Sequence, residues 1–581
     1  MNDKYIAIIN SNSRGSESDI CALQEDALRS VDMRLCYSSS HVRLYASSTT
    51  PTIAIPGLGV IVGCVFSRNG TPVSDDGQLG GARNGIELEK LLIDSFWGDY
   101  IFFSTPECGD SLARVYRDSS GGVPCAFSIR DGSGFVTSSI SLAEHLGLLD
   151  RSIDWDHIGR FLAFPYLRTG RTGLAGVSEL PPGCSLTLRQ TSLINHPEWS
   201  PWKYLSSRKR YRDPHTASAC VRAAVDMTVK ALAENDREIA LEISGGLDSS
   251  IVAASLQRTS ARVACCTIMP PVPGTDERRY SKQMADQLGV SLETVSIDFK
   301  DALIEFPTSR DAVIPSMGIL HRAVDEAMAR AAGQHRTRSY FSGNGGDSVF
   351  CYLKGASPAA DAFKSRGPMA GIEAIRNLST LHRCSYWKAA RLTMRKLVRG
   401  AASPWKADSS FIREDWVHQD VGDHPWFDMP PDSLPGDAEW IHSLVGTQSY
   451  RDSVYKKAKH HIRQPLLSQP VVEACLMAPT WMWIKNGADR AVARSAYASR
   501  LPLDILHRRS KGSYLNYGGA LYSRNKSDIL NFLSTGVLAS EGVIDVSAIK
   551  QFIHSDRSHH GLSFMRLFDL CMVENWVRNQ G

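Results

Sequence analysis

The stretch LEISGGLDSS, Leu241–Ser250, decides how this chain folds. The preceding run Glu238–Ile243 places its apolar residues on one face, which predicts a half-buried strand, and the apolar run Ile251–Leu256 predicts the first turns of a helix. Two glycines between these elements allow a sharp turn and a close approach to the backbone. Because the free N–H groups and the dipole of a helix N-terminus favour negative charge, the motif predicts an anion-binding loop.

The anion that suits this loop is the pyrophosphate part of ATP. The motif is not a Walker loop, since it has no Gly-Lys-Ser/Thr. It resembles instead the PP-loop of ATP pyrophosphatases, which split ATP into AMP and pyrophosphate and so activate a carbonyl or carboxylate. A chance Gly-Gly turn is the alternative. The resemblance implies that ATP is bound by Ile243, Ser244, Gly245, Gly246, Asp248 and Ser249.

A second glycine-rich segment, SGNGGDSVF at Ser342–Phe350, follows a short β-type run at Arg338–Ser342. A carboxylate at the end of such a loop can hold a hard cation, and Mg²⁺ on a triphosphate takes only one or two protein carboxylates. Asp248 and Asp347 are the natural pair of magnesium ligands, although Asp347 can also simply cap the next helix. The two segments together resemble the synthetase domain of the asparagine synthetase family. By that resemblance the nucleotide site also includes Ser342, Gly343 and Gly345.

The resemblance continues towards the C-terminus. A helix is predicted in which Tyr280, Met284 and Leu288 share one face. Its expected stop is Gly289. The segment Arg463–Leu467 is similar to the Arg-x-Pro-(Phe/Leu)-Leu segment of the family.

A basic segment, Arg509–Gly512, follows the run Leu501–Leu506. In the family, a lysine placed like Lys511 neutralises the charge of the acyl-adenylate transition state and of the departing pyrophosphate. Preorganised positive charge of this kind is often the largest catalytic contribution. The resemblance therefore implies that Asp248, Asp347 and Lys511 are catalytic, whereas a lysine in a glycine-containing loop taken alone is usually just solvated.

The first third of the chain resembles a class II glutamine amidotransferase domain without its nucleophile. Glutamine-dependent asparagine synthetases begin with a processed cysteine, whereas this chain begins Met1–Lys4 and its first cysteine is Cys21. The segments that resemble the scaffold of that domain are Phe96–Ile101, Val115–Cys125 and Leu180–Gly183. The resemblance therefore implies an α+β glutamine-amidotransferase-like sandwich, residues 1–206, that is inactive as a glutaminase.

From Pro214 onward, helical and strand patterns alternate, which predicts a parallel α/β sheet followed by a mostly helical region. We assign residues 207–581 to an α/β PP-loop ATP pyrophosphatase domain of the asparagine synthetase type. The polar segment Pro197–Arg212 is the expected linker. The proline-rich segment Ala401–Glu439 is expected to be either an extended loop bordering the substrate cavity or a disordered surface insertion.

A synthetase without its own ammonia source must use another nucleophile. Two branches of the family use an amine of the substrate itself: β-lactam synthetases and lasso-peptide cyclases. The Tyr-Arg-Asp-x-Ser-Gly-x-x-Pro-Cys form at Tyr116–Cys125 and the variant at Ser342–Ser348 look closest to the cyclases. Ser348 and His461 replace acidic residues of the family, which weakens an aspartate-specific pocket. We therefore expect an ATP- and Mg²⁺-dependent lasso-peptide cyclase, an AMP-forming carbon–nitrogen ligase.

Such a cyclase adenylates an Asp or Glu side chain of a core peptide and closes a macrolactam with the N-terminal amine of the peptide. The general base that takes the amine proton is open among Tyr352, Asp452 and His461. By resemblance, the partners are a precursor peptide, a leader peptidase and a leader-recognition protein. The remaining alternatives are a β-lactam synthetase, an ammonia-dependent asparagine synthetase and, from another class, a non-catalytic nucleotide-binding partner.

The composition, 581 residues with 43% apolar and 22% charged, is typical of a globular protein of two or more domains. The net charge of +4 is small for this length and does not call for nucleic acid. The longest apolar run, Ile53–Phe66, contains Pro56 and several glycines and is shorter than the roughly 20 residues of a membrane helix, so no membrane span is expected. Thirteen cysteines without a Cys-x-x-Cys predict a reducing cytoplasm and neither a disulfide framework nor a zinc site.

Overall fold

The computed structural model describes residues 4–10, 18–104, 111–189, 192–315, 318–400, 405–451, 461–509, 514–555 and 563–580. The first part of the chain is rich in strands. These strands are β1 Tyr5–Ile9, β2 Met33–Ser38, β3 Val42–Ser47, β4 Thr52–Ile55, β5 Gly59–Ser67, β6 Phe96–Ser104, β7 Ser111–Arg117, β8 Ala126–Arg130, β9 Ser133–Thr137, β10 Ser178–Glu179, β11 Cys184–Arg189 and β12 Leu193–Pro197.

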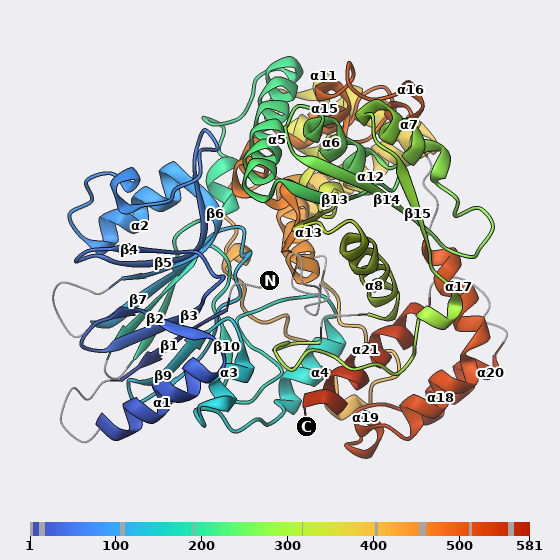
Figure 1. Cartoon of the computed structure of the whole chain (residues 1–581). Helices are drawn as coiled ribbons and strands as arrows, with labels where there is room; N and C mark the ends of the chain where they lie inside the picture. Colours follow the sequence, from blue (N-terminus) through green and yellow to red (C-terminus); the bar gives the residue numbers. More distant parts are fainter. Residues whose placement is uncertain are drawn as a thin grey trace.

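Two antiparallel sheets form a sandwich at the left of Figure 1. The strand order is β10-β8-β9-β1-β3-β2 in one sheet and β12-β11-β7-β6-β5-β4 in the other. Every residue of β1 is buried, because both of its faces are covered. Tyr5, Ala7 and Ile9 belong to the core between the sheets. Ile6 and Ile8 pack on the opposite side, in a cluster that also contains residues of the second part.

The second part of the chain is built on a parallel sheet. Its strands are β13 Glu238–Glu242, β14 Arg262–Met269, β15 Leu292–Ser296, β16 Ser339–Phe341 and β17 His461–Arg463. The order is β15-β14-β13-β16-β17, and all four pairings are parallel. Because β13 and β16 are neighbours, the segments 243–246 and 342–346 leave the sheet at the same edge. The predicted parallel sheet, and with it the mixed α and β architecture, is confirmed.

Helices cover both faces of this sheet (Figure 1). One face carries α5 Pro214–Asp236, α6 Leu247–Leu256 and α7 Arg278–Leu288, and the other carries α8 Ile319–Gln334. In α7, Met284 is fully buried, and Tyr280 and Leu288 pack against the same core cluster. Gly289 ends the helix with a φ of 72°. The helix and the stop predicted there are both confirmed.

The rest of the second part is mostly helical. Its helices are α9 Gly346–Val349, α10 Ser357–Arg366, α11 Pro368–Leu381, α12 Tyr386–Arg399, α13 Pro435–Arg451, α14 Gln469–Leu476, α15 Ala491–Ala496, α16 Leu503–Leu506, α17 Tyr514–Arg524, α18 Lys526–Ser534, α19 Val537–Ser540, α20 Val546–His554 and α21 Met565–Gln580. The sandwich carries α1 Ser18–Ser30, α2 Gly85–Ser95, α3 Ile140–His145 and α4 Trp155–Ala163. The 3₁₀ turns are Asp76–Leu79, Pro201–Tyr204, Phe299–Asp301, Glu414–Trp416, Pro425–Phe427, Pro465–Leu467 and Thr480–Trp483. Within the described ranges, the helices lack the combined length and apolar character that crossing a membrane requires.

The segment expected to be a polar linker, Pro197–Arg212, is partly buried between the two parts. Trp199, Trp202 and Tyr204 belong to the main core cluster. The indole N–H of Trp199 and the hydroxyl of Tyr204 both donate to a carboxylate oxygen of Glu473 in α14, at 3.0 and 2.7 Å. These aromatic side chains have large apolar faces to bury, so the segment is part of an interface and not a polar spacer. The predicted boundary after residue 206 stays a prediction.

The predicted loop or insertion, Ala401–Glu439, is described from residue 405 onward. It is irregular as far as α13, and it packs against both parts of the molecule. Ile412 forms an isolated bridge with Ile544, and the buried Trp426 contacts Trp199 with ring centroids 5.6 Å apart. With residues of the sandwich, the segment borders a cavity of about 640 Å³. The described residues of the predicted nucleotide site do not line that cavity.

Two buried carboxyl groups connect α10 with α13. Asp361 and Asp437 are both fully or almost fully buried. The Asp361 side chain accepts hydrogen bonds from the Gly436 N–H at 2.9 Å and from the Thr480 hydroxyl at 2.6 Å. Burial, followed by the charge of Asp437, raises the pKa of Asp361 to about 8. Asp361 therefore keeps its proton at neutral pH in the folded protein.

This pair predicts a pH dependence of stability. The folded-state pKa of Asp361 lies above the unfolded value of about 3.9, so its contribution is complete below that value and is lost as the pH rises through about 8. We expect the free energy of unfolding to fall by more than about 1 kcal/mol through this group between about pH 5 and pH 9. Asp361→Asn should flatten that slope in urea denaturation, whereas the exposed control Asp276→Asn should leave it unchanged. An unaltered slope in Asp361→Asn would mean that the carboxyl is ionised.

Candidate active site

The first predicted loop turns between β13 and the N-terminus of α6. Gly245 has a φ of 65°, in the left-handed region, and a Cβ on it would lie 2.6 Å from the Cβ of Tyr280. Ser249 Oγ accepts a hydrogen bond from the Ser244 N–H at 3.2 Å and lies 3.1 Å from Ser244 Oγ, which closes the loop. α6 starts directly after Gly246, so the N–H groups and the dipole of this ten-residue helix face the loop. This geometry is what an anion site requires.

Ile243 and Arg508 anchor that loop. Ile243 donates its N–H to the Cys266 carbonyl at 2.8 Å, and its own carbonyl accepts from the Ser281 hydroxyl at 2.8 Å. Arg508 donates to the carbonyl of Gly245 at 3.0 Å. The backbone N–H and carbonyl of Ile243 thus both form hydrogen bonds within the protein. Arg508 is a supporting residue that sequence reasoning missed, although it directly precedes the basic segment predicted to be catalytic.

The second glycine-rich segment packs directly on the first. A Cβ on Gly343 would lie 2.5 Å from the backbone nitrogen of Ser249, and a Cβ on Gly346 would lie 2.5 Å from Cγ of Asp248. Gly345, between them, has a φ of 84°. Only glycine lets the two loops approach this closely, which explains why the segment is glycine-rich.

Ser342 begins the second segment and is itself buried. Its N–H donates to the carbonyl of Arg463 in β17 at 3.1 Å. Its hydroxyl accepts from the Asn344 N–H at 3.2 Å and donates to the carboxylate of Glu242 at 3.3 Å. Because Glu242 is the last residue of β13, this contact ties the ends of the neighbouring strands together. The residues predicted for the nucleotide site are thus gathered at one edge of the sheet.

The two predicted magnesium ligands meet at one nitrogen of Arg490. Its Nη1 lies 3.1 Å from an oxygen of Asp248 and 2.6 Å from an oxygen of Asp347. Burial lowers the pKa of Arg490, but the carboxylates of Asp248, Asp347 and Asp489 outweigh this effect and raise it above its ordinary value. Two carboxylates this close repel each other unless a cation compensates them. The pair therefore fits a hard divalent cation.

Arg490 lies within the region that resembles the family, but the sequence analysis gave it no role; the structure pairs it with both predicted magnesium ligands. It lies at the N-cap of α15 with a φ of 50°, in the left-handed region that residues other than glycine rarely adopt. Backbone strain of this kind is concentrated at functional sites. The guanidinium carbon lies 5.3 Å from the ring centre of Tyr352, whose N–H donates to the carbonyl of Asp347 at 2.9 Å. Its sequence signal is its place between Arg463–Leu467 and Arg509–Gly512, two segments that resemble the family.

The candidates for the general base differ in their surroundings. Tyr352 lies beside the carboxylate pair, but burial and the charge of Asp489 raise the pKa of its phenol, which keeps it protonated near neutral pH. Burial and the charge of Arg463 lower the pKa of His461 to about 4, so its imidazole is neutral. Asp452 lies outside the described residues. The assignment of the base therefore stays open.

Ser348, which replaces an acidic residue of the family, is bonded to α13. Its hydroxyl accepts from the hydroxyls of Ser443 and Thr447 at 2.9 and 2.5 Å, and its carbonyl accepts from the indole N–H of Trp440 at 2.6 Å. The side chain thus holds the second loop against α13. The predicted catalytic Lys511 lies outside the described residues, so its role stays a prediction.

Comparison with known proteins identifies the second part of the chain. The asparagine synthase family model matches residues 220–578, more than half of the chain. No curated protein matches the sequence.

Two solved structures show weak likeness to the fold. The allosteric regulatory enzyme of purine biosynthesis is 11% identical with a TM-score of 0.21, over 57% of this chain and 82% of that chain. Glutamine phosphoribosylpyrophosphate amidotransferase from B. subtilis, complexed with ADP and GMP, is 10% identical with a TM-score of 0.20, over 59% and 84%. At these scores the likeness adds nothing to the architecture described above.

The family match covers the parallel sheet, both glycine-rich loops, the carboxylate pair and Arg490. These elements form one site, in which the N-terminus of α6 lies beside two carboxylates that share the guanidinium of Arg490. The chain belongs to the asparagine synthase family and is accordingly an ATP-dependent ligase that forms carbon–nitrogen bonds.

Proposed function

We propose that this ligase is a lasso-peptide cyclase. It adenylates an Asp or Glu side chain of a core peptide and joins the activated carbonyl to the N-terminal amine of the same peptide, with release of AMP and pyrophosphate. The observation that carries the adenylation step is that Asp248 and Asp347 both pair with the guanidinium of Arg490, beside the N-terminus of α6. The cyclase branch rests on the sequence form at Tyr116–Cys125.

The interior of the sandwich supports a scaffold role for that domain. Tyr5, at the start of β1, is fully buried, contacts Phe103 edge-on and donates to the carbonyl of Pro124 at 3.1 Å. Arg117 is buried and donates to the carboxylate of Glu179 at 3.0 Å. Arg117 and Pro124, in the segment Val115–Cys125 that resembles the family's hairpin, are therefore used for packing and internal hydrogen bonds. The nucleophile for amide formation is accordingly proposed to come from the peptide.

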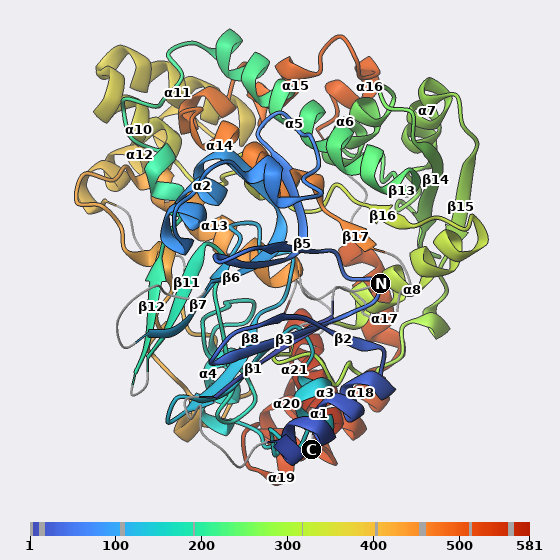
Figure 2. The same ribbon diagram turned by 60° about the vertical axis from the view of Figure 1, so that its left-hand side comes forward.

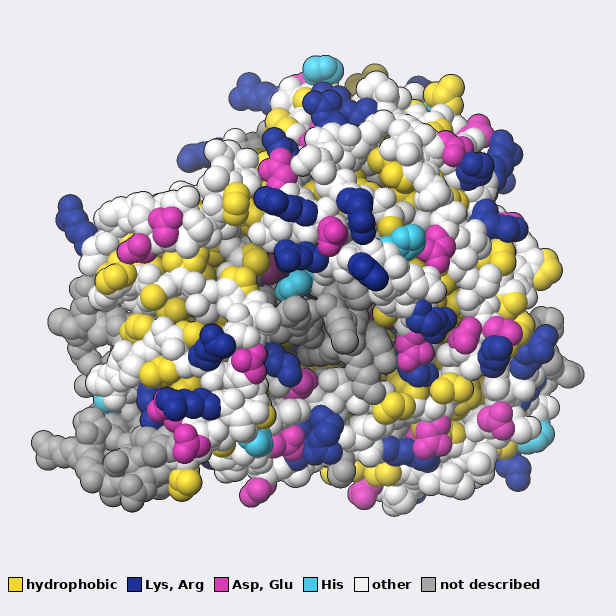
Figure 3. Space-filling view, viewed as in Figure 1, with side chains coloured by type: hydrophobic (Ala, Val, Ile, Leu, Met, Phe, Trp, Pro, Cys, Tyr) yellow, Lys and Arg dark blue, Asp and Glu magenta, His cyan; other side chains and the backbone are white. Residues whose placement is uncertain are grey.

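ATP is proposed to bind over Ser244–Ser249, where the N–H groups of α6 face its phosphates. Mg²⁺ held by Asp248 and Asp347 would neutralise charge on the triphosphate. Arg490 supplies a fixed positive charge at the same place, and Lys511 is proposed to stabilise the transition state. Figure 3 shows Lys and Arg side chains near the centre of the face that it draws, with Asp and Glu side chains among them.

The reaction then has two steps. A carboxylate oxygen of the peptide attacks the α-phosphorus, the bond to the bridging oxygen breaks, and pyrophosphate leaves. The α-amine of the peptide attacks the acyl carbon, loses a proton to a base, and AMP leaves as the amide forms. Holding the amine and the acyl-adenylate in contact raises their effective molarity, which can lower the barrier by about 7–11 kcal/mol. The proposed partners are the precursor peptide, a leader peptidase and a leader-recognition protein.

The test is pyrophosphate release, with mass spectrometry of the product. Purified protein and Mg-ATP would receive three substrates separately: aspartate with ammonia, a β-amino acid of the β-lactam precursor type, and peptides with an N-terminal Gly and an internal Asp or Glu. Pyrophosphate release with loss of one water from a peptide is the expected result. Turnover of a small molecule alone would overturn the cyclase assignment in favour of that branch of the family.

The carboxylate pair predicts a specific loss of activity. Asp248→Asn and Asp347→Asn should each lower pyrophosphate release by about 100-fold or more, because each removes a charge that holds the cation on the phosphates. The matched control is Asp276→Asn, an exposed carboxylate whose partner is the neighbouring Arg278. It should keep wild-type activity. Full activity in either site variant would remove the pair from the mechanism.

The close approach of the two loops predicts that Gly346→Ala disables the site. The added methyl group meets the Asp248 side chain at 2.5 Å and must displace the carboxylate. A misplacement of about 1 Å can cost about 100-fold in rate, so we expect a loss of that order. Gly333→Ala is the matched control. Gly333 lies in α8, and a Cβ added to it would meet no atom within 4 Å. It should retain activity and raise the unfolding free energy by about 0.5–1 kcal/mol.

A further inference from the structure

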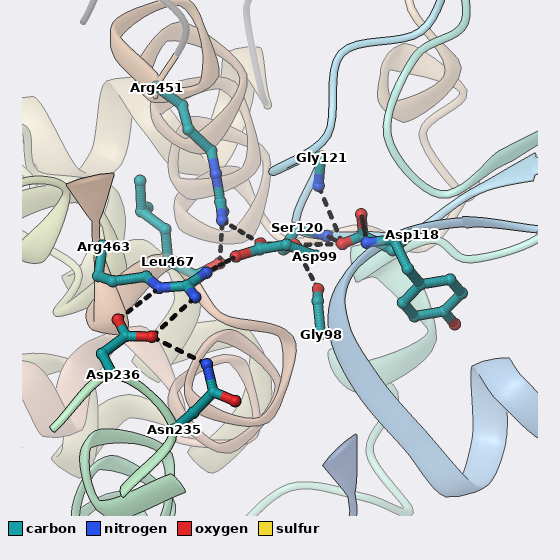
Figure 4. Close-up of polar contacts among 11 residues, drawn as sticks. Gly98, Asp99, Asp118, Ser120, Gly121, Asn235, Asp236, Arg451, Arg463 and Leu467 are labelled. Carbon is teal, nitrogen blue, oxygen red and sulfur yellow. Dashed lines mark hydrogen bonds and ion pairs between the residues drawn. The ribbon is translucent and has the colours of Figure 1, made fainter. Parts of the chain in front are cut away.

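A largely buried network of charges joins the sandwich to the synthetase domain (Figure 4). Asp99, in β6, accepts a hydrogen bond from Nη2 of Arg451 at 2.6 Å and one from Nη1 of Arg463 at 3.1 Å. Arg451 ends α13 and Arg463 ends β17, the strand at the edge of the parallel sheet (Figure 2). One carboxylate of the sandwich is therefore shared by two arginines of the other domain.

Arg463 is also held from its own domain. Its Nε and Nη2 donate to the two carboxylate oxygens of Asp236, the last residue of α5, at 2.9 and 3.1 Å. The side chains of Arg463 and Asp236 are only 7% and 5% exposed. A buried guanidinium requires partners on all its donors, and loss of one charged partner is costly. Asp99 thus completes the charge compensation that Asp236 begins.

The sandwich fixes Asp99 by its own hydrogen bonds. The hydroxyl of Ser120 lies within hydrogen-bonding distance of Asp99 (2.9 Å), of the carbonyl oxygen of Gly98 (2.8 Å) and of Asp118, and it can donate its one hydrogen to any of them. Asp118, next in this cluster, accepts from the N–H groups of Ser120 and Gly121 at 2.7 and 3.1 Å. Burial tends to raise the pKa of the Asp99 carboxyl, but Arg451 and Arg463 hold it below its ordinary value. The carboxylate therefore stays charged in the interface.

The same two arginines reach the second glycine-rich loop. The carbonyl of Arg463 accepts from the N–H of Ser342, the first residue of the loop, at 3.1 Å. Arg451 donates to the carbonyl of Leu467 at 3.5 Å. Leu467 packs closely on Gly345. A Cβ added to Gly345 would lie only 2.5 Å from Cδ2 of Leu467. The network therefore supports the loop that carries Asp347 at two points.

We propose that Asp99 is a positioning residue for the ATP site. Through Arg463 and Arg451, the sandwich sets the position of Ser342–Asp347 and so of one proposed cation ligand. The inference rests on the proposed function for the place where ATP binds. It gives the sandwich a task within the ligase reaction that needs no glutaminase chemistry.

The test is direct binding of Mg²⁺ and α,β-methylene-ATP, an analogue in which the bond to be broken is blocked, by isothermal titration calorimetry. Asp99→Asn keeps the shape of the side chain and removes its charge. We expect it to raise the dissociation constant by about tenfold or more. Hydrogen exchange should become faster in residues 338–350 and stay unchanged in the core of the sandwich. The control is Asp94→Asn, whose carboxylate forms an exposed ion pair with Lys203 at 3.3 Å.

A double-mutant cycle separates positioning from loss of stability. If Asp99 acts through Arg451, then Asp99→Asn combined with Arg451→Gln should weaken binding no more than the stronger single variant. Multiplying effects would contradict action through Arg451, and a lowered melting temperature with unchanged affinity would contradict the proposal as a whole. If Asp99→Asn fails to fold, Ser120→Ala, which removes one hydroxyl from Asp99, replaces it and should change affinity in the same direction by a smaller factor.

The two proposals fail in different ways. Wild-type binding of the nucleotide with equal binding by the variants would overturn the positioning role and leave the cyclase assignment untouched. Absence of nucleotide binding in the wild type would overturn both. Normal nucleotide binding and positioning together with turnover of a small molecule alone would overturn only the cyclase assignment.

Discussion

The close contact between two glycine-rich loops is the constraint on which the site depends. The loops leave neighbouring parallel strands, β13 and β16, at the same edge of the sheet. Gly343 and Gly346 then let the second loop press against the backbone of Ser249 and the side chain of Asp248. No other residue type leaves that space. The relative position of the two carboxylates follows from this contact, so backbone packing sets the geometry of the proposed cation site.

Charge compensation governs the rest of the site. Asp248, Asp347 and Asp489 surround Arg490, whose left-handed backbone directs it into the cluster. Arg508 holds the first loop from the other side, through the carbonyl of Gly245. Acidic and basic groups are therefore paired beside the N-terminus of α6. Such preorganised charge needs little rearrangement when charge develops on a substrate, which is the physical basis of electrostatic catalysis.

The sandwich is integrated with the ligase domain rather than attached to it. Its aromatic connector is buried against α14 through Trp199 and Tyr204. Its Asp99 lies between two arginines whose backbone and neighbours support the second loop. Burying charges across an interface is costly unless each is paired, so a partner of the right sign must be supplied from the opposite side. The ion pairs of the domain interface are thus linked to the second loop through the backbone of Arg463, which accepts a hydrogen bond from Ser342.

The sequence predicted the parallel sheet, α7 with its Gly289 stop, and the residues of both loops, because strand alternation, helical periodicity and glycine motifs are local patterns. Other features depend on contacts between residues far apart in the chain. Arg490 lies 242 residues from Asp248, and Arg463 lies 364 residues from Asp99. The burial of Trp199 and Tyr204 was missed for the same reason, since composition alone indicated a polar linker.

The sequence by itself determined the family resemblance, the loop chemistry and the candidate carboxylates. The tertiary structure alone decided that Arg490 compensates those carboxylates, that Ser348 is hydrogen-bonded to α13, and that Asp99 of the sandwich pairs with Arg463. The physical reason is that a motif specifies local backbone geometry and side-chain chemistry. Charge pairing and burial, in contrast, depend on which distant elements the folded core brings together.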